Sequence, residues 1–320
     1  MSVESPQPLA KSTLPEIFQV ELTSRCTLSC DFCPHPSLLR KKHDMPWEKF
    51  RDHILPYFTR DLSHQKEVGL YMMGEPLLHP EYFTIQRAIR RARPDMKIEI
   101  ATNGTRFTPA VVERLVLDPP DYMICDVTPW KESPDAMRRV SISVAHTAAI
   151  LAHRWPATVA AECKRDGRQL PQIAIQLVQR TDHPVQFPLT MLDLANRYPD
   201  RILLKEKFLD SWAGQLPDMI SISSVQPPET RTCCEEPFRR VAVTVDGDVV
   251  PCCRDAHASI KYGNLFSGDS LETIWNGPVA EMVRERMLSG DSTLLPIPCR
   301  TCREFHIKMD RHQSTEECRD

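Results

Sequence analysis

The stretch Cys26-Thr27-Leu28-Ser29-Cys30-Asp31-Phe32-Cys33 places three thiols close together in the chain. A structural zinc site closes with a fourth ligand, and the next cysteine pair lies far beyond this stretch. His35 could supply that ligand, so zinc stays an alternative. Three thiolates also suit an iron–sulfur cube that leaves one iron open for another molecule. Phe32 would give such a site an apolar wall.

Composition and charge exclude several function classes. The chain has 320 residues, of which 41% are hydrophobic and 26% charged, as in a globular protein with a substantial core. A formal net charge of −3 provides no basic footprint for nucleic acid and no polybasic patch for a membrane. The polar, proline-containing start lacks a signal-peptide core, and no apolar run has membrane-spanning length. We expect a cytoplasmic protein without nucleic-acid or membrane partners.

The chain contains 12 cysteines, most of them in tight groups. In a reducing compartment such groups predict metal or cluster ligands rather than disulfides. A secreted, disulfide-bonded protein is disfavoured by the length of the chain and the missing signal segment. The cysteines outside the predicted ligand sets are expected to act as small buried hydrophobes; they are Cys125, Cys163, Cys233, Cys253 and Cys318.

Short β-rich runs alternate with helix-like segments along the first two thirds of the chain. The expected strands are 18–22, 68–73, 97–102, 122–127, 173–178 and 202–204, and the expected helices are 47–58, 81–93, 109–116, 134–153 and 188–197. This alternation predicts βα units around a parallel sheet. About six units are fewer than the eight of a closed TIM barrel. The predicted fold class is therefore α/β, with an open, partial barrel.

The last third of the chain has a different pattern. Residues 221–231 are polar and contain proline, as in a linker. Val241 to Val245 continues through Asp246-Gly247 into a second apolar run, which predicts a β-hairpin. An amphipathic helix is expected from Ser270 to Leu288. Its apolar stripe consists of Leu271, Ile274, Trp275, Val279, Met282 and Val283.

Polar residues stand at the carboxyl ends of the expected strands, where α/β folds bind ligands. They are Glu21 and Thr23, Gly74 and Glu75, Thr102 and Asn103, Asp126 and Thr128, Gln179 and Arg180, and Lys205. Strand alternation puts Asp126 and Thr128 on one face and Cys125 on the other. Asp126 is thus a candidate for proton transfer or hydroxyl binding toward a substrate. A strand-end cap or a salt bridge is the alternative role.

Three of these segments together resemble the radical S-adenosylmethionine (radical SAM) family. Cys26-x3-Cys30-x-Phe32-Cys33 matches its cluster motif, and Met73-Gly74-Glu75-Pro76 is similar to its Gly-Gly-Glu-Pro motif, with methionine in place of the first glycine. Thr102-Asn103-Gly104 resembles the segment that lines the ribose. The resemblance spans residues 16–210 and implies a partial (βα)6 barrel.

What this resemblance implies about cofactors is specific. Cys26, Cys30 and Cys33 would hold a [4Fe-4S] cluster whose open iron chelates SAM, and reduction would cleave SAM to a 5′-deoxyadenosyl radical that abstracts a hydrogen atom from substrate. The barrel would orient both groups and exclude water. The expected cofactor-binding residues are Phe32, Gly74, Glu75, Pro76, Thr102, Asn103, Gln179 and Arg180.

A second cysteine set follows in the last third. Cys234 and Cys252 flank the hairpin turn, and Cys299-x2-Cys302 comes after the expected helix. Four thiolates would close either a zinc site or an iron–sulfur cube. The spacing resembles the SPASM auxiliary-cluster domain in its shortened form, called twitch, which implies one auxiliary [4Fe-4S] cluster. Cys233 stays an alternative to Cys234.

These features give an expected domain organisation. It consists of a tail at 1–15, the barrel at 16–215, a linker at 216–232, the twitch domain at 233–310 and a tail at 311–320. Trp212-Ala213-Gly214 lies where related proteins carry an aromatic-x-Gly turn, whose simplest role is to pack the last loop of the barrel.

The resemblance also implies a reaction class, because twitch relatives of this size include dehydrogenases and epimerases of aminocyclitols and aminoglycoside sugars. We expect a dehydrogenase of such a natural product, with Asp126 as base, the auxiliary cluster as electron acceptor and a flavodoxin- or ferredoxin-type reductant. An epimerase that uses Cys253 as hydrogen-atom donor is the first alternative. Peptide modification is the second, disfavoured because neither a leader-binding extension nor a full SPASM domain is evident. The non-enzyme alternative, a zinc-bearing scaffold, would not explain why the Gly74-Glu75-Pro76 and Thr102-Asn103-Gly104 segments are present.

Overall fold

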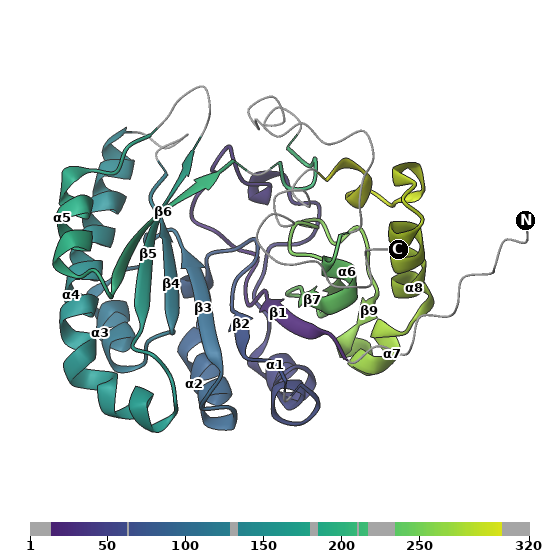
Figure 1. The fold of residues 1–320 in the computed structure, drawn as a ribbon, viewed down its shortest axis with the longest axis horizontal. Coiled ribbons are helices and arrows are strands. Elements are labelled where there is room, and N and C mark those ends of the chain that lie inside the picture. Colours follow the sequence, from purple (N-terminus) through teal and green to yellow (C-terminus); the bar gives the residue numbers. More distant parts are fainter. Residues whose placement is uncertain are drawn as a thin grey trace, which may run out of the picture.

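The computed structural model describes residues 14–62, 64–128, 134–179, 185–209, 211–216 and 234–302. Six parallel strands form the centre of the fold (Figure 1). They are β1 (Glu16–Val20), β2 (Glu67–Gly69), β3 (Lys97–Thr102), β4 (Tyr122–Asp126), β5 (Gln172–Gln179) and β6 (Ile202–Phe208). The helices between them are α1 (Trp47–His53), α2 (Tyr82–Ala92), α3 (Pro109–Leu117), α4 (Pro134–Arg165) and α5 (Leu189–Arg197). The predicted α/β class with an open parallel sheet is confirmed.

The C-terminal elements continue the same sheet. They are α6 (Glu236–Arg239), β7 (Arg240–Val243), β8 (Asp248–Val250), β9 (Gly263–Asn264), α7 (Leu271–Trp275) and α8 (Pro278–Leu288). The strand order is β6-β5-β4-β3-β2-β1-β7-β8-β9. β7 pairs in parallel with β1, with Glu16 opposite Arg240, and the predicted hairpin β7–β8 is antiparallel. The two parts of the chain are therefore joined by backbone hydrogen bonds, which the sequence did not indicate.

One face of the barrel strands forms the core. Ile98 and Ile100 of β3 lie in one apolar cluster with helix side chains such as Ile85 and Trp155. Figure 1 shows α1 to α5 outside the curved sheet and α6 to α8 beside the part of the sheet that contains β7 and β9. Since successive side chains alternate between faces, Glu99 and its equivalents on other strands point to the inner side.

Three predicted helices differ from the observed ones. Residues 47–58 were expected as one helix, but α1 ends at His53 and a separate π-helical turn spans Tyr57–Asp61. Residues 134–153 were expected as a helix, but α4 continues to Arg165. The expected helix from Ser270 to Leu288 is divided into α7 and α8. Gly277 is the N-cap of α8 and Pro278 its first residue, because a proline without a backbone N–H begins a helix easily but cannot continue one.

Four residues of the apolar stripe in that region, Leu271, Ile274, Trp275 and Val283, are nevertheless buried, whereas Val279 and Met282 are half-buried. Across the parts of the chain that the structure describes, no helix combines the length and the apolar character needed to cross a bilayer. The end of the linker at residue 232 and the start of the C-terminal tail at residue 311 lie outside the described ranges. The proposed division into domains therefore stays a prediction.

Candidate active site

A cavity of about 350 Å³ opens at the carboxyl ends of the barrel strands, within the size range of small-molecule sites. Its wall combines the loop after β1 with residues from the ends of β2 to β6. The predicted site residues that line it are Cys26, Cys30, Phe32, Cys33, Gly74, Glu75, Thr102, Asn103, Asp126, Thr128 and Lys205. Segments far apart in the sequence thus meet at the carboxyl ends of the parallel strands, where the sequence predicted a ligand site.

The three cysteines of the opening stretch face this cavity and are half-buried. The Asn103 side-chain amide donates to Cys26 Sγ at 3.5 Å. Burial is the main cause that raises the pKa of the Cys33 thiol, to about 11. A bound cluster would reverse this shift, because positively charged iron favours the thiolate. Three thiols on one wall of an open cavity fit a cube with one iron left accessible.

His35 does not complete a four-ligand zinc site. Its side chain is buried, its Nε2 lies 3.0 Å from the backbone oxygen of Ser24, and it is not among the residues that line the cavity. Within the described ranges, no three His, Cys, Asp or Glu side chains stand close enough to hold one metal ion. A single zinc ion would draw its thiolates to about 2.3 Å, whereas a cube spreads them over separate irons. The spacing therefore fits a cube better than zinc.

Gly74 lies tightly against the loop that carries the cysteines. A Cβ atom added to it would stand 2.1 Å from the backbone oxygen of Thr23 and 2.7 Å from that of Arg25. The backbone N–H of Glu75 donates to the same Arg25 oxygen at 2.8 Å. Only glycine permits this close approach, which sets the cysteine loop against the end of β2.

Glu75 joins two of the predicted motifs. Its carboxylate accepts from Thr102 Oγ1 and from the backbone N–H of Asn103, both at 2.8 Å, and from the backbone N–H of Leu77 at 3.1 Å. Burial raises its pKa from 4.5 to about 7, against these hydrogen bonds. The side chain therefore aligns the ends of β2 and β3 and presents a carboxyl group at the cavity wall.

The far wall of the cavity carries polar groups suited to a substrate. Asp126 Oδ2 accepts from Gln176 Nε2 at 3.0 Å and its Oδ1 from the backbone N–H of Thr128 at 2.9 Å. Tyr71 donates its hydroxyl to Glu99 at 2.6 Å. Burial, followed by the Glu99 charge, keeps the pKa of this tyrosine well above its usual value. The hydroxyl thus stays a donor at neutral pH.

Sequence reasoning missed several residues of this wall, namely Tyr71, Glu99, Gln176 and Trp212. A signal for some of them was present in the strands. In β3, Glu99 alternates with Ile98 and Ile100, so a charged side chain faces away from the buried core. Tyr71 and Trp212 follow the ends of β2 and β6, so the alternation of side chains along a strand gives no signal for them.

Some predicted site residues lie elsewhere or cannot be placed. Gln179 does not line the cavity, because its amide is bonded to both backbone groups of Val185, at 2.6 and 2.9 Å. Pro76 is buried at the start of a 3₁₀ turn and does not line it either. Cys253 is packed beside an apolar cluster that includes Met72 and Met73. Arg180, Cys233 and Cys318 lie outside the described residues.

The second cysteine set lines a separate cavity. Cys234, Cys252, Cys299 and Cys302 all face it, among apolar neighbours such as Ile260. The β7–β8 hairpin returns Cys252 toward Cys234, and Cys299 and Cys302 enclose a short 3₁₀ turn after α8. An all-thiol, apolar site with four ligands fits a closed iron–sulfur cube.

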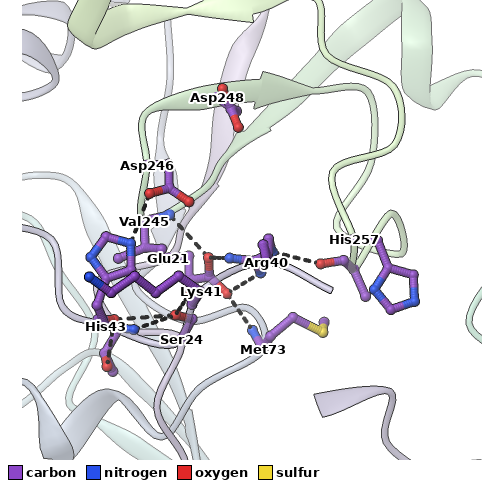
Figure 2. Close-up of polar contacts among 12 residues, drawn as sticks. Glu21, Ser24, Arg40, Lys41, His43, Met73, Val245, Asp246, Asp248 and His257 are labelled. Atoms are coloured by element: carbon purple, nitrogen blue, oxygen red, sulfur yellow. Dashed lines mark hydrogen bonds and ion pairs between the residues drawn. The ribbon is translucent and has the colours of Figure 1, made fainter. Parts of the chain in front are cut away.

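A buried ion pair connects the two parts of the chain (Figure 2). Arg40, in the loop after the cysteine stretch, donates two hydrogen bonds to Glu21, at 2.5 and 2.6 Å. Glu21 also accepts from the backbone N–H groups of Met73 and Val245. The Arg40 Nε donates to the backbone oxygen of Ala256 at 2.8 Å. One carboxylate therefore joins β1, the end of β2, the cysteine loop and the C-terminal hairpin.

Comparison with known protein families gives two matches. The model of the Radical SAM superfamily matches residues 20–141, and that of SPASM, an iron-sulfur cluster-binding domain, matches residues 233–303. These ranges contain the first and the second cysteine set, respectively.

Two curated proteins are similar to this chain in sequence. The tungsten-containing aldehyde ferredoxin oxidoreductase cofactor-modifying protein of Pyrococcus furiosus is 23% identical over 269 residues, covering 76% of this chain and 72% of the relative. The AdoMet-dependent heme synthase of Methanosarcina barkeri is 32% identical over 108 residues, covering 33% of this chain and 29% of the relative.

Solved structures share the fold. BtrN in complex with AdoMet and 2-DOIA superposes with a TM-score of 0.60 at 16% identity, covering 91% of this chain and 94% of BtrN. SuiB of Streptococcus suis bound to S-adenosylmethionine superposes with a TM-score of 0.52 at 13% identity, covering 96% of this chain and 78% of SuiB.

Proposed function

We propose that this chain is a radical SAM dehydrogenase of a small polyhydroxylated substrate. Its cofactors are SAM, a [4Fe-4S] cluster and an auxiliary iron–sulfur cluster, as the matches to the Radical SAM and SPASM models imply. The proposed substrate class is an aminocyclitol or related sugar, oxidised at a secondary alcohol. The proposed cluster ligands are Cys26, Cys30 and Cys33 in the barrel and Cys234, Cys252, Cys299 and Cys302 in the auxiliary site.

The observation that carries this proposal is the position of Asp126. Its carboxylate lines the same cavity as the three cysteines of the barrel. Gln176 and the backbone of Thr128 each bind one of its oxygens, which fixes the carboxylate and leaves lone pairs for a substrate hydroxyl. A carboxylate held in this way can serve as a general base.

The proposed groups account for the hydrogen atom, the proton and the electron that the alcohol loses. When bound, SAM and its cluster supply a radical that takes a hydrogen atom from carbon, and the auxiliary cluster supplies an acceptor for one electron. Asp126 takes the hydroxyl proton, so the alcohol loses two hydrogens and becomes a carbonyl. Tyr71 and Glu99, on the neighbouring wall, would orient the other hydroxyl or amino groups of the substrate.

The surroundings of Cys253 favour dehydrogenation over epimerisation. An epimerase of this class needs a thiol that faces the substrate and returns a hydrogen atom. Cys253 packs among apolar side chains and is not part of the cavity wall, and Cys125 is buried in the core. Epimerisation stays the first alternative, with Cys253 as its donor after a local rearrangement.

The comparisons support a small substrate and keep one alternative open. BtrN shares the fold over nearly the whole chain and was solved with AdoMet and 2-DOIA, so aminocyclitols of this kind are the first compounds to test. SuiB was also solved with its precursor peptide, which keeps peptide modification as the second alternative. A flavodoxin- or ferredoxin-type protein is the proposed reductant.

The experiment is an anaerobic assay with dithionite, SAM and a panel that includes 2-DOIA, other aminocyclitols and a ribosomal peptide. We expect 5′-deoxyadenosine together with a product that lacks two hydrogens. Asp126→Asn should lower product formation by about 10²-fold or more and leave the iron content unchanged. Asp193→Asn, on the exposed face of α5, is the matched control. An inverted product of unchanged mass, or a modified peptide only, would refute the dehydrogenase assignment.

A further inference from the structure

The turn Trp212-Ala213-Gly214 has an unusual backbone. Its three residues have φ angles of 52°, 57° and 81°, all in the left-handed region. Glycine adopts this region freely, whereas tryptophan and alanine do so at a cost. Consecutive strained residues persist only where their surroundings hold them in place. The contacts of this turn therefore indicate what it is held against.

On one side the turn holds the loop of the first cysteine set. Trp212 Nε1 donates to the backbone oxygen of Phe32 at 3.0 Å, and Phe32 stands between Cys30 and Cys33 in the sequence. The indole lines the barrel cavity, and Lys207 Nζ lies 5.7 Å from the centre of its ring. Trp212 thus fixes the backbone between two of the proposed ligands.

On the other side the turn holds the loop of the second set. Ala213 lines the cavity that contains the four cysteines, and its backbone oxygen accepts from Thr301 Oγ1 at 2.6 Å. Thr301 stands between Cys299 and Cys302. A Cβ atom added to Gly214 would come within 2.6 Å of Thr301 Cβ and 3.1 Å of the Thr301 backbone oxygen, so Gly214 packs directly against this residue.

A third contact fixes the turn itself. Gln215 Nε2 donates to the backbone oxygen of Trp212 at 2.6 Å and also to that of Arg254. Arg254 follows two residues after Cys252. Three adjacent residues and their neighbour therefore contact the ligand-bearing loops of both sites.

We propose that Trp212-Ala213-Gly214 is a positioning bridge that holds the two cluster-binding loops in a fixed relation. Through it, a displacement of the Cys299–Cys302 loop is transmitted to the Cys30–Cys33 loop, and the reverse. Such coupling between sites is reciprocal by thermodynamic necessity. The proposal rests on the two ligand sets of the proposed function and is independent of which substrate is oxidised.

The test perturbs each end of the bridge and observes the opposite site. Gly214→Ala introduces a clash at Thr301, and the milder Thr301→Val removes the hydrogen bond to Ala213. Trp212→Phe removes the hydrogen bond to Phe32 and keeps an aromatic ring. Gly290→Ala is the matched glycine control, because Gly290 has a φ of 71° and its added Cβ would meet nothing within 4 Å. Trp47→Phe is the control for the indole.

The readouts are iron content and EPR spectra of the reduced holoenzyme with SAM, and the reduction potential of the auxiliary cluster. Gly214→Ala and Thr301→Val should change the spectrum of the SAM-bound cluster, and Trp212→Phe should shift the auxiliary potential. The magnetic interaction between the clusters should change in all three variants and in neither control. If each variant alters only the signal of the site that it touches, the loops are independent and the proposal is wrong. None of these readouts uses a substrate, so a failed dehydrogenase assay would leave the result intact.

Discussion

The buried ion pair between Glu21 and Arg40 allows a quantitative prediction for Arg40→Met. The Glu21 side chain is 0% exposed and that of Arg40 9%. Methionine keeps much of the volume but removes both hydrogen bonds to the carboxylate and the one to Ala256. The backbone N–H groups of Met73 and Val245 continue to bind Glu21, yet they carry no full positive charge to balance it.

Removal of one partner from a buried pair costs about 3 to 5 kcal/mol, because a charge is left without compensation. The entropy of unfolding is about 2.1 cal/mol/K per residue, so 320 residues give about 0.7 kcal/mol/K. A loss of about 3 to 5 kcal/mol then lowers Tm by about 4 to 7 °C. One sheet runs from β6 to β9, which supports treating the unfolding as a single transition.

The assay is anaerobic thermal unfolding of the cluster-loaded protein, followed by circular dichroism and by the visible absorbance of the clusters. Arg51→Met is the control, since the exposed pair of Arg51 with Asp52 should contribute nothing measurable. The double variant Glu21→Gln/Arg40→Met should recover part of the loss, because no buried charge remains. A Tm for Arg40→Met equal to that of Arg51→Met, or a double variant less stable than Arg40→Met, would refute the reasoning.

Two further predictions concern the wall of the barrel cavity. Gly74→Ala should abolish iron binding at the first cysteine set, because the added Cβ would lie 2.1 Å from the Thr23 backbone oxygen. Iron analysis of the purified protein checks this prediction. Gly167→Ala is the control, because its added Cβ would enter open space. For Glu75 the folded pKa is raised from 4.5 to about 7 by burial, so the folded apoprotein binds more protons than the unfolded chain between these values. Its stability should therefore fall as the pH rises through this window, by about 3 kcal/mol in total. Urea unfolding at a series of pH values should show this decrease in the free energy of unfolding for the wild type and a smaller decrease for Glu75→Gln. If both proteins lose the same stability with rising pH, the buried Glu75 carboxyl is not the cause of the decrease.

Much of the fold could be predicted from local patterns. The alternation of β-rich and helical segments predicted every barrel strand to within a few residues, and the Asp246-Gly247 turn predicted the β7–β8 hairpin. These features depend on neighbours in the sequence, so one chain is enough to detect them. The expected helix from Ser270 to Leu288 was wrong at Gly277-Pro278, although the dipeptide itself carried the signal for a break.

Parts of the site were equally visible. The spacing of the first three cysteines, the Gly74-Glu75 pair and the Thr102-Asn103 pair predicted one cavity, and the structure brings these residues to it. Gln179 was misjudged because a residue at a strand end can point to a loop as well as to a lumen, and its amide binds Val185. Local pattern does not distinguish these two cases.

Local sequence patterns specify the predicted ligand sets, which are three thiols for a cluster with an open position and four thiols for a second site, together with the motifs that accompany them. How the two predicted sites are joined depends on contacts that appear only in the folded chain. The pairing of β7 with β1, the burial of Glu21 under Arg40, and the bridge from Phe32 through Trp212 to Thr301 all connect residues that are distant in the chain. Ligand spacing is a local property, which the order of residues records directly. Contacts over such separations depend on how complete elements pack, and no short stretch of sequence encodes them.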